Sequence, residues 1–323
     1  MPALNESTQT FPEINPGYNR VFRPNRLSIG LISPLETYAS GPVPSMARHL
    51  ERARSAEKSG FSALWLRDVP FNVPSFGDAG QVFDPFVYLG FLAGQTQSIA
   101  LGVASMILPL RHPAHVAKAA ASVDQLSGGR LILGIASGDR PDEYPALNET
   151  YENRGERFRD SVDYIRAMAQ SAPTFENRYG KTNGEMDLLP RPTAGKIPML
   201  ITGGSQQTPQ WGARHSDGLI TYPRNIETQA SVVSGWRAGI PGGPESSKPV
   251  IQSLYIDLLA DPEAPPQPIH LGFSAGMNYL KTYLKSLEEI GVNHVALNLR
   301  FNQADTEETI LYLAEDLLPE FPA

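Results

Sequence analysis

The 323-residue sequence contains no cysteine, which excludes disulfides, thiolate nucleophiles and cysteine-ligated metals. It also lacks an excess of positive charge, because 27 lysine and arginine residues are outnumbered by 34 aspartate and glutamate residues. A formal net charge of −7 argues against nucleic acid or an anionic membrane surface as the main partner. No apolar run is long enough to span a membrane, and the first 20 residues have neither the basic nor the apolar segment of a signal peptide. We therefore expect a cytoplasmic protein.

The stretch from Ile99 to Glu143 predicts the type of fold. It begins with a buried strand over Ile99–Leu108, continues with a helix over Pro113–Leu126, and reaches a second buried strand over Leu131–Ala136. The helix shows its apolar residues at intervals of three and four, whereas both strands are continuous apolar runs. A strand–helix–strand unit of this kind places its two strands parallel.

The same alternation extends along the chain. Strands are expected at 27–32, 63–66, 99–108, 131–136, 198–202, 219–222, 249–259 and 295–299, and helices at 45–59, 85–95, 113–126, 155–169, 208–215, 226–238, 277–289 and 307–318. Eight strand–helix units without a repeat or a linker favour a closed (β/α)8 TIM barrel over an open, doubly wound sheet. Residues 26–323 are expected to form this single domain, with an insertion and a short hairpin at 171–196. Residues 1–25 are expected to form an arm on the surface or on a partner subunit.

Two segments resemble the bacterial luciferase family, the luciferase-like flavin-dependent monooxygenases. They are ILPLRHP at residues 107–113 and VDQLSGGRLILGIASG at residues 123–138, and looser similarity runs from about Leu27 to Arg300. The resemblance implies a (β/α)8 barrel with a flavin at its carboxyl-terminal mouth. It also implies a two-component monooxygenase, in which reduced FMN from a flavin reductase and O2 oxygenate a small organic substrate. The family usually forms homodimers, and the alanine-rich helix at 114–126 would permit close helix approach.

Residues Gly203–Thr208 are a candidate phosphate site, because they follow a predicted strand and open a predicted helix. Backbone N–H groups at such a turn, together with the helix dipole, favour an anion. Ser205 or Thr208 could instead only cap the helix. The segment GGSQQTPQW resembles the one that holds the FMN phosphate in luciferase. The resemblance implies phosphate contacts at Gly204, Ser205 and Thr208, with Gly203 beside them.

A phosphate also favours a fixed guanidinium, which can bond to two of its oxygens. The resemblance implies that Arg154, at the start of a predicted helix, has this role. Arg157 and Arg159 are rivals, and all three could equally be solvated surface charges.

The ends of the third and fourth strands are candidate positions for the flavin ring. The resemblance implies a cis peptide bond between Ala104 and Ser105 beneath the ring, next to Met106. In the fourth strand, the small residues Ser137 and Gly138 leave room for a planar group.

Two carboxylates are candidate catalytic groups. Asp139 follows the fourth strand and could transfer a proton, and deazaflavin-using relatives carry a glutamate at this place. Asp68 ends the second strand and could contact the ring or the substrate, or form an ion pair with a neighbouring arginine. Luciferase has a histidine pair where this chain has Val69 and Pro70, which argues against light emission and aldehyde chemistry.

No metal site is predicted. His112 and His115 have a suitable spacing on a helix, but no carboxylate cluster accompanies them, so helix capping or packing is the better interpretation. Two alternatives to the monooxygenase stay open, namely hydride transfer with the deazaflavin F420 and a flavin-binding protein without turnover. We expect the loops 67–83, 171–196 and 260–276 to cover the site.

Overall fold

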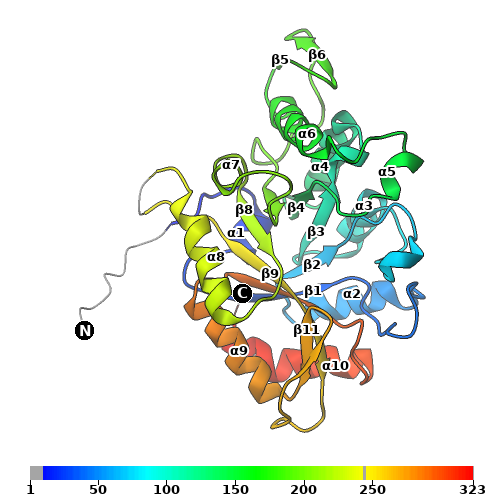
Figure 1. Ribbon diagram of the computed structural model, residues 1–323, viewed down its shortest axis with the longest axis vertical. Helices are drawn as coiled ribbons and strands as arrows, with labels where there is room; N and C mark the ends of the chain where they lie inside the picture. The colour runs from blue at the N-terminus through cyan, green and yellow to red at the C-terminus, as the bar shows by residue number, and fades with distance from the viewer. Residues whose placement is uncertain (1–9, 243–244, 323) are drawn as a thin grey trace.

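The computed structural model describes residues 10–242 and 245–322, and its core is a closed barrel of parallel strands (Figure 1). The strands follow in the order β1 (Ser28–Ile32), β2 (Ala63–Leu66), β3 (Ala100–Ile107), β4 (Leu131–Ala136), β7 (Met199–Thr202), β8 (Gly218–Thr221), β9 (Val250–Leu258) and β12 (His294–Asn298). The barrel is closed because β12 pairs with β1 and β9 pairs with β8. The predicted fold is therefore confirmed, and each strand lies within one residue of its predicted bounds.

Helices surround the barrel (Figure 1). They are α1 (Pro16–Val21), α2 (His49–Lys58), α3 (Pro85–Gln95), α4 (Pro113–Leu126), α5 (Glu143–Ala146), α6 (Arg154–Met168), α7 (Pro209–His215), α8 (Ile226–Ala238), α9 (Met277–Glu289) and α10 (Thr306–Tyr312). Both α3 and α4 begin with a proline that follows a capping side chain, Asp84 in α3 and His112 in α4. Such a pair of residues predicts the start of a helix. The helix predicted at 307–318 differs, because it changes into a π turn at Leu313–Leu317 and then a 3₁₀ turn.

None of the helices in the described ranges is long and apolar enough to cross a membrane.

A few large side chains fill the barrel interior. Trp65 is fully buried, and a Cβ atom on Gly102 would lie 2.3 Å from its ring, so glycine at 102 makes room for the indole. The Trp65 Nε1–H donates to His294 Nε2 at 2.8 Å, and Ser28 Oγ lies 2.7 Å from His294 Nδ1. Burial lowers the pKa of His294 to about 3, so its ring is neutral and bridges the two neighbours.

The expectation of a surface arm is wrong for residues 14–22. Tyr18 and Phe22 are buried against the side chains that fill the barrel, and the Tyr18 hydroxyl donates to the Asp217 carbonyl at 2.9 Å just before β8. The Asn15 amide donates to the Leu131 carbonyl at the start of β4. Helix α1 therefore closes the amino-terminal end of the barrel, because its apolar side chains cover a surface that water would otherwise reach. Residues 1–9 of the predicted arm lie outside the described residues.

The predicted insertion contains the hairpin expected there, formed by β5 (Thr174–Asn177) and β6 (Gly180–Asn183). Figure 1 shows this hairpin projecting beyond α6, away from the barrel. Arg178 pairs with Asp160 and Glu156 of α6, which holds the hairpin on the outer side of that helix. A second hairpin, β10 (Gln267–Ile269) and β11 (Gly272–Ala275), extends the sheet beside β9.

Candidate active site

A cavity of about 710 Å³ opens at the carboxyl-terminal ends of the barrel strands, and all eight strands contribute to its wall. In barrels of this type the same end carries the chemistry. The loops 67–83 and 260–276 also line the cavity, through Phe76 and Asp78 in one and His270 in the other. The insertion 171–196 contributes no lining residue, so its predicted covering role is wrong. Its contacts go to the outer sides of α4 and α6 instead.

The turn after β7 forms one side of the cavity. Gly203, Ser205 and Gln206 all adopt left-handed backbone conformations, with φ of 54°, 44° and 61°. Within the described part of the chain, the N–H groups of Gly204, Ser205 and Gln206 donate no hydrogen bond. A compact turn with several free N–H groups is a site that favours an anion.

Arg154 lines the cavity next to this turn. Helix α6 approaches closely because its second residue is glycine: a Cβ atom on Gly155 would lie 2.8 Å from Gln206 Cβ. The guanidinium of Arg154 lies over the Tyr151 ring at 3.7 Å and donates to the Tyr151 carbonyl at 3.0 Å. Its Nε is buried and has no hydrogen-bond partner among the described residues. A buried donor without a partner is rare, and here it lies beside a turn of free N–H groups.

The other candidates for an anion do not line the cavity, although Arg159 donates to the Gln207 side chain at 3.4 Å. Arg157 pairs with Glu149 and donates to the Pro109 carbonyl at 3.1 Å, outside the cavity. Arg159 is exposed and also absent from the lining. Thr208 accepts a hydrogen bond from Trp211 N at 3.2 Å and does not line the cavity, so the helix-capping interpretation is correct for Thr208.

Small residues form the adjacent wall at the ends of β3 and β4. The Ala104–Ser105 peptide bond is cis, as the resemblance implied. Ala104, Ser105, Ser137 and Gly138 all line the cavity. Met106 does not, because its fully buried side chain packs in the core between the strands and the helices. The expected contact of the Met106 side chain with a ring is therefore not supported.

The two candidate carboxylates have different surroundings. The side chain of Asp68 is fully buried, and its two oxygens accept hydrogen bonds from Arg111 at 2.7 and 3.1 Å. The Ile107 N–H also donates to it at 3.0 Å. The ion-pair interpretation therefore holds for Asp68. Asp139 is exposed on the cavity wall and forms no ion pair within the described ranges.

Sequence reasoning missed a cluster of arginines around Asp78. Arg67 pairs with the Asp78 carboxylate, and Arg300 pairs with it at 3.0 Å. Arg140 donates to the Asp78 carbonyl at 3.0 Å. A signal was available for two of the three arginines, because Arg67 and Arg300 directly follow predicted strands at the end that carries chemistry. Asp78 lies in a loop whose sequence gives no such signal.

His112 is a helix cap, since its Nδ1 accepts a hydrogen bond from Ala114 N at 3.2 Å. Across residues 10–242 and 245–322, no three histidine, aspartate or glutamate side chains come together in a way that would hold a metal ion.

Comparisons with known proteins agree with this geometry. The family model described as luciferase-like monooxygenase matches residues 27–251. The chain is 27% identical over 234 residues to 4-hydroxyprotoasukamycin monooxygenase of Streptomyces nodosus subsp. asukaensis, covering 70% of this chain and 61% of that protein. It is 29% identical over 196 residues to an F420-dependent hydroxymycolic acid dehydrogenase of Mycobacterium tuberculosis, covering 59% and 53% respectively.

A solved structure shares the fold. The oxygenating constituent of 3,6-diketocamphane monooxygenase, a type II Baeyer–Villiger monooxygenase from a Pseudomonas putida plasmid, superposes with a TM-score of 0.70 at 14% identity. The match covers 91% of this chain and 98% of that structure, which was solved in complex with FMN. The chain belongs to the luciferase-like monooxygenase family, a family of oxidoreductases.

Proposed function

We propose that this protein is an FMN-dependent monooxygenase that oxygenates a small organic substrate in the cavity at the barrel mouth. One observation carries the proposal: the unpartnered Nε of Arg154 lies beside a turn whose N–H groups donate no hydrogen bond in the described chain. A dianionic phosphate would satisfy both sets of donors, and charge-assisted hydrogen bonds of this kind are strong. The residues present therefore fit the phosphate of FMN.

The neighbouring residues fit a planar ring. Ala104, Ser105 and Gly138 have little side-chain bulk, and the cavity continues from the phosphate turn to these strand ends. When bound, FMN would supply the redox chemistry with O2, and the barrel would orient it and limit the access of water. A separate flavin reductase as the source of reduced FMN, and a homodimer as the assembly, are further parts of the proposal.

The Arg154 site can be tested by comparing FMN with riboflavin, which lacks the phosphate. Isothermal titration calorimetry of the purified protein should give a lower Kd for FMN than for riboflavin. Arg154→Met should weaken FMN binding about tenfold or more, because hydrogen bonds to charged groups contribute about 1.5–3 kcal/mol. Riboflavin binding should stay unchanged.

Arg214→Met is the control, since Arg214 is an exposed arginine on α7 that does not line the cavity. Thermal unfolding of both variants would report any loss of fold. Equal affinities of the wild-type protein for FMN and riboflavin would contradict the proposal, as would equal effects of the two substitutions on FMN.

A second candidate function is hydride transfer with F420. Asp139 favours it, because its exposed carboxylate is on the cavity wall where it could hold or release a proton. The similarity to an F420-dependent dehydrogenase supports it as well. Two assays separate the candidates: oxygen uptake with reduced FMN across a panel of substrates, and anaerobic reduction of F420 by a panel of alcohols. Activity in the second assay alone would replace the monooxygenase proposal.

A further inference from the structure

The arginine subsite, which we define as Arg67, Arg140 and Arg300 with Asp78, lies across the cavity from the phosphate turn. Arg67 follows β2 and Arg300 follows β12, on either side of β1. In the eight-strand ring, β1 is four strands away from β7, after which the phosphate turn begins. Arg140 comes from the loop after β4, which neighbours β7, and it joins the subsite because its guanidinium donates to the Asp78 carbonyl at 3.0 Å. The cavity therefore has a second cationic cluster around Asp78, besides the one at the phosphate turn that the proposed cofactor would take.

The subsite carries more positive than negative charge. Although burial opposes it, the charge of Arg67 holds the pKa of Asp78 below its usual value, so Asp78 is ionised and offsets one of three guanidinium groups. Glu143 approaches Arg140 at 3.9 Å without a hydrogen bond, and burial raises its pKa to about 7. Asp139 is exposed, so solvent screens its charge. An uncompensated buried cation is costly, and an anionic ligand would remove that cost.

Two donors of the subsite have no hydrogen-bond partner in the described part of the chain. Arg140 Nη1 and Arg300 Nε are buried and make no hydrogen bond within the described residues, although both side chains line the cavity. These side chains are only 5% and 10% exposed. Buried guanidinium nitrogens are normally paired, so these two point to a ligand that accepts hydrogen bonds.

The arginines are held rigidly. Arg300 donates to the Gly77 carbonyl at 2.5 Å and to the Gly41 carbonyl at 3.3 Å. The Tyr38 hydroxyl donates to the Asp78 carboxylate at 3.1 Å. Both Tyr38 and Gly41 belong to the loop after β1, so the position of that loop determines the geometry of the subsite.

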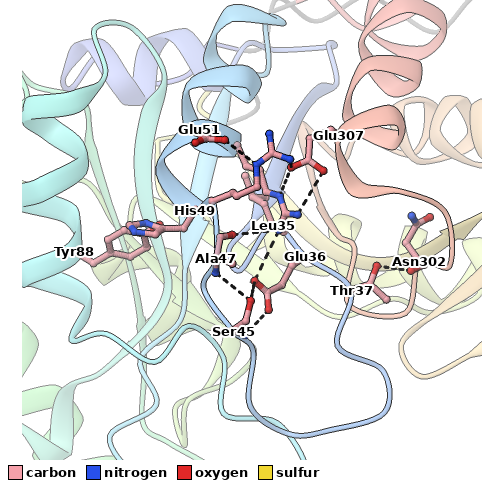
Figure 2. A network of polar contacts seen from close by, with 12 residues as sticks. Leu35, Glu36, Thr37, Ser45, Ala47, His49, Glu51, Tyr88, Asn302 and Glu307 are labelled. Atoms are coloured by element: carbon pink, nitrogen blue, oxygen red, sulfur yellow. Dashed lines mark hydrogen bonds and ion pairs between the residues drawn. The ribbon is translucent and has the colours of Figure 1, made fainter.

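Figure 2 shows the polar network that fixes this loop. Glu36 accepts hydrogen bonds from Ser45 N and Oγ, and Arg52 donates to the Leu35 carbonyl at 2.9 Å while pairing with Glu307 at 2.7 Å. Because this network fixes the loop that holds Arg300 and Asp78, the side chains of the arginine subsite lose little conformational entropy when they bind a ligand.

Aromatic side chains surround the unpaired donors. The guanidinium of Arg140 lies 4.5 Å from the centre of the Phe76 ring, and that of Arg300 lies 5.2 Å from the Phe301 ring. Tyr255 and His270 complete this wall of the cavity. A ligand bound here would therefore place an oxyanion on the arginines and an apolar or aromatic body against the rings.

We propose that the arginine subsite selects substrates that carry a carboxylate or sulfonate group on a small apolar or aromatic body. The assignment of this ligand as the substrate rests on the proposed function, because the proposed cofactor occupies the opposite side of the cavity. Either oxyanion has more than one oxygen that can accept a hydrogen bond from a guanidinium, so it can bond to the free donors of both Arg140 and Arg300, and this shared chemistry is what the subsite recognises.

The test measures anion binding directly and does not depend on turnover. Benzoate, benzenesulfonate, inorganic sulfate and the neutral benzyl alcohol would be titrated into the protein at constant ionic strength, with and without saturating FMN. Benzoate and benzenesulfonate should bind at least tenfold more tightly than benzyl alcohol and sulfate, and FMN should not displace them. Displacement by FMN would show that the phosphate site holds the anion, and equal binding of benzyl alcohol or sulfate would also overturn the proposal.

Substitutions then identify the residue. Arg140→Met should weaken benzoate binding at least tenfold and leave FMN binding unchanged, and Arg140→Lys should restore part of the benzoate affinity. Arg224→Met is the control, because Arg224 follows β8 at the same end of the barrel but does not line the cavity. Unchanged benzoate binding by a folded Arg140→Met variant would refute the subsite. Intact benzoate binding by a protein that fails to bind FMN would refute the proposed cofactor and leave the anion subsite standing.

Discussion

Acidification should destabilise this protein through the histidine inside its barrel. His294 is fully buried between Trp65 and Ser28, and its Nε2 accepts a hydrogen bond that only the unprotonated nitrogen can accept. Burial lowers the pKa of His294 to about 3, compared with 6.5 for the free side chain. The unfolded chain therefore binds a proton at this residue between pH 6.5 and pH 3, whereas the folded chain does not. Stability is fully present above pH 6.5 and falls as the pH decreases through this window.

The size of the effect follows from the shift in pKa. Each pH unit within the window costs about 1.4 kcal/mol of unfolding free energy for one proton. Between pH 8 and pH 5 the loss from His294 alone is about 2 kcal/mol. Carboxylates paired in the folded state contribute a loss of the same sign, so a variant is needed to isolate the histidine.

His294→Gln provides this comparison, because glutamine is neutral and can both accept from Trp65 and donate to Ser28. Urea unfolding would be measured at several pH values from 8 to 5. The wild-type protein should lose about 2 kcal/mol more than the variant over this range. His115→Gln, at an exposed helix position, should retain the wild-type pH dependence. An identical pH dependence in wild type and His294→Gln would refute the assignment of a neutral, buried His294.

Two further substitutions test the packing around the site. Gly155→Ala places a Cβ atom 2.8 Å from Gln206 Cβ, so calorimetry should show FMN binding about fivefold or more weaker. Gly94→Ala, which meets no atom within 4 Å, should bind FMN normally, and an equal loss in both would contradict the account. Arg111→Met leaves the buried Asp68 carboxylate without its cation and should cost about 3–5 kcal/mol in urea unfolding. Replacing both Arg111 and Asp68 by leucine should cost less than the single change, and additive losses would show that the pair is not coupled.

The barrel was predictable because its signals are local. The buried strands are continuous apolar runs, and helices such as α3 and α4 begin at a capping residue followed by proline. Helix α1 has only six residues, too few for a helical period to be visible, so its polar and proline-rich surroundings suggested a surface arm. Its buried position depends on long-range contacts, such as the one between Tyr18 and Asp217. The strands β10 and β11 were missed because their sequences, QPI and GFSA, contain proline or glycine and form no continuous apolar run.

The candidate site was predictable only in part. The residues that the resemblance implied at the strand ends line the cavity, apart from Met106 and Thr208. Residue type and spacing alone could not distinguish Arg154 from Arg157. Both are on α6, but only the side chain of Arg154 lines the cavity, whereas Arg157 pairs with Glu149. The arginine subsite depends on the loop that places Asp78 between Arg67 and Arg300, which are more than 200 residues apart in the sequence. No local sequence pattern predicts such a long-range contact.

The account depends most on where an anionic cofactor tail would bind. A crystal structure of the protein soaked with FMN tests this directly. We expect the phosphate between the Arg154 guanidinium and the backbone N–H groups of residues 204–206, with the ring over Ala104 and Ser105. Density for the phosphate on the arginine subsite, or an FMN molecule bound outside the cavity, would contradict the assignment of the cofactor site.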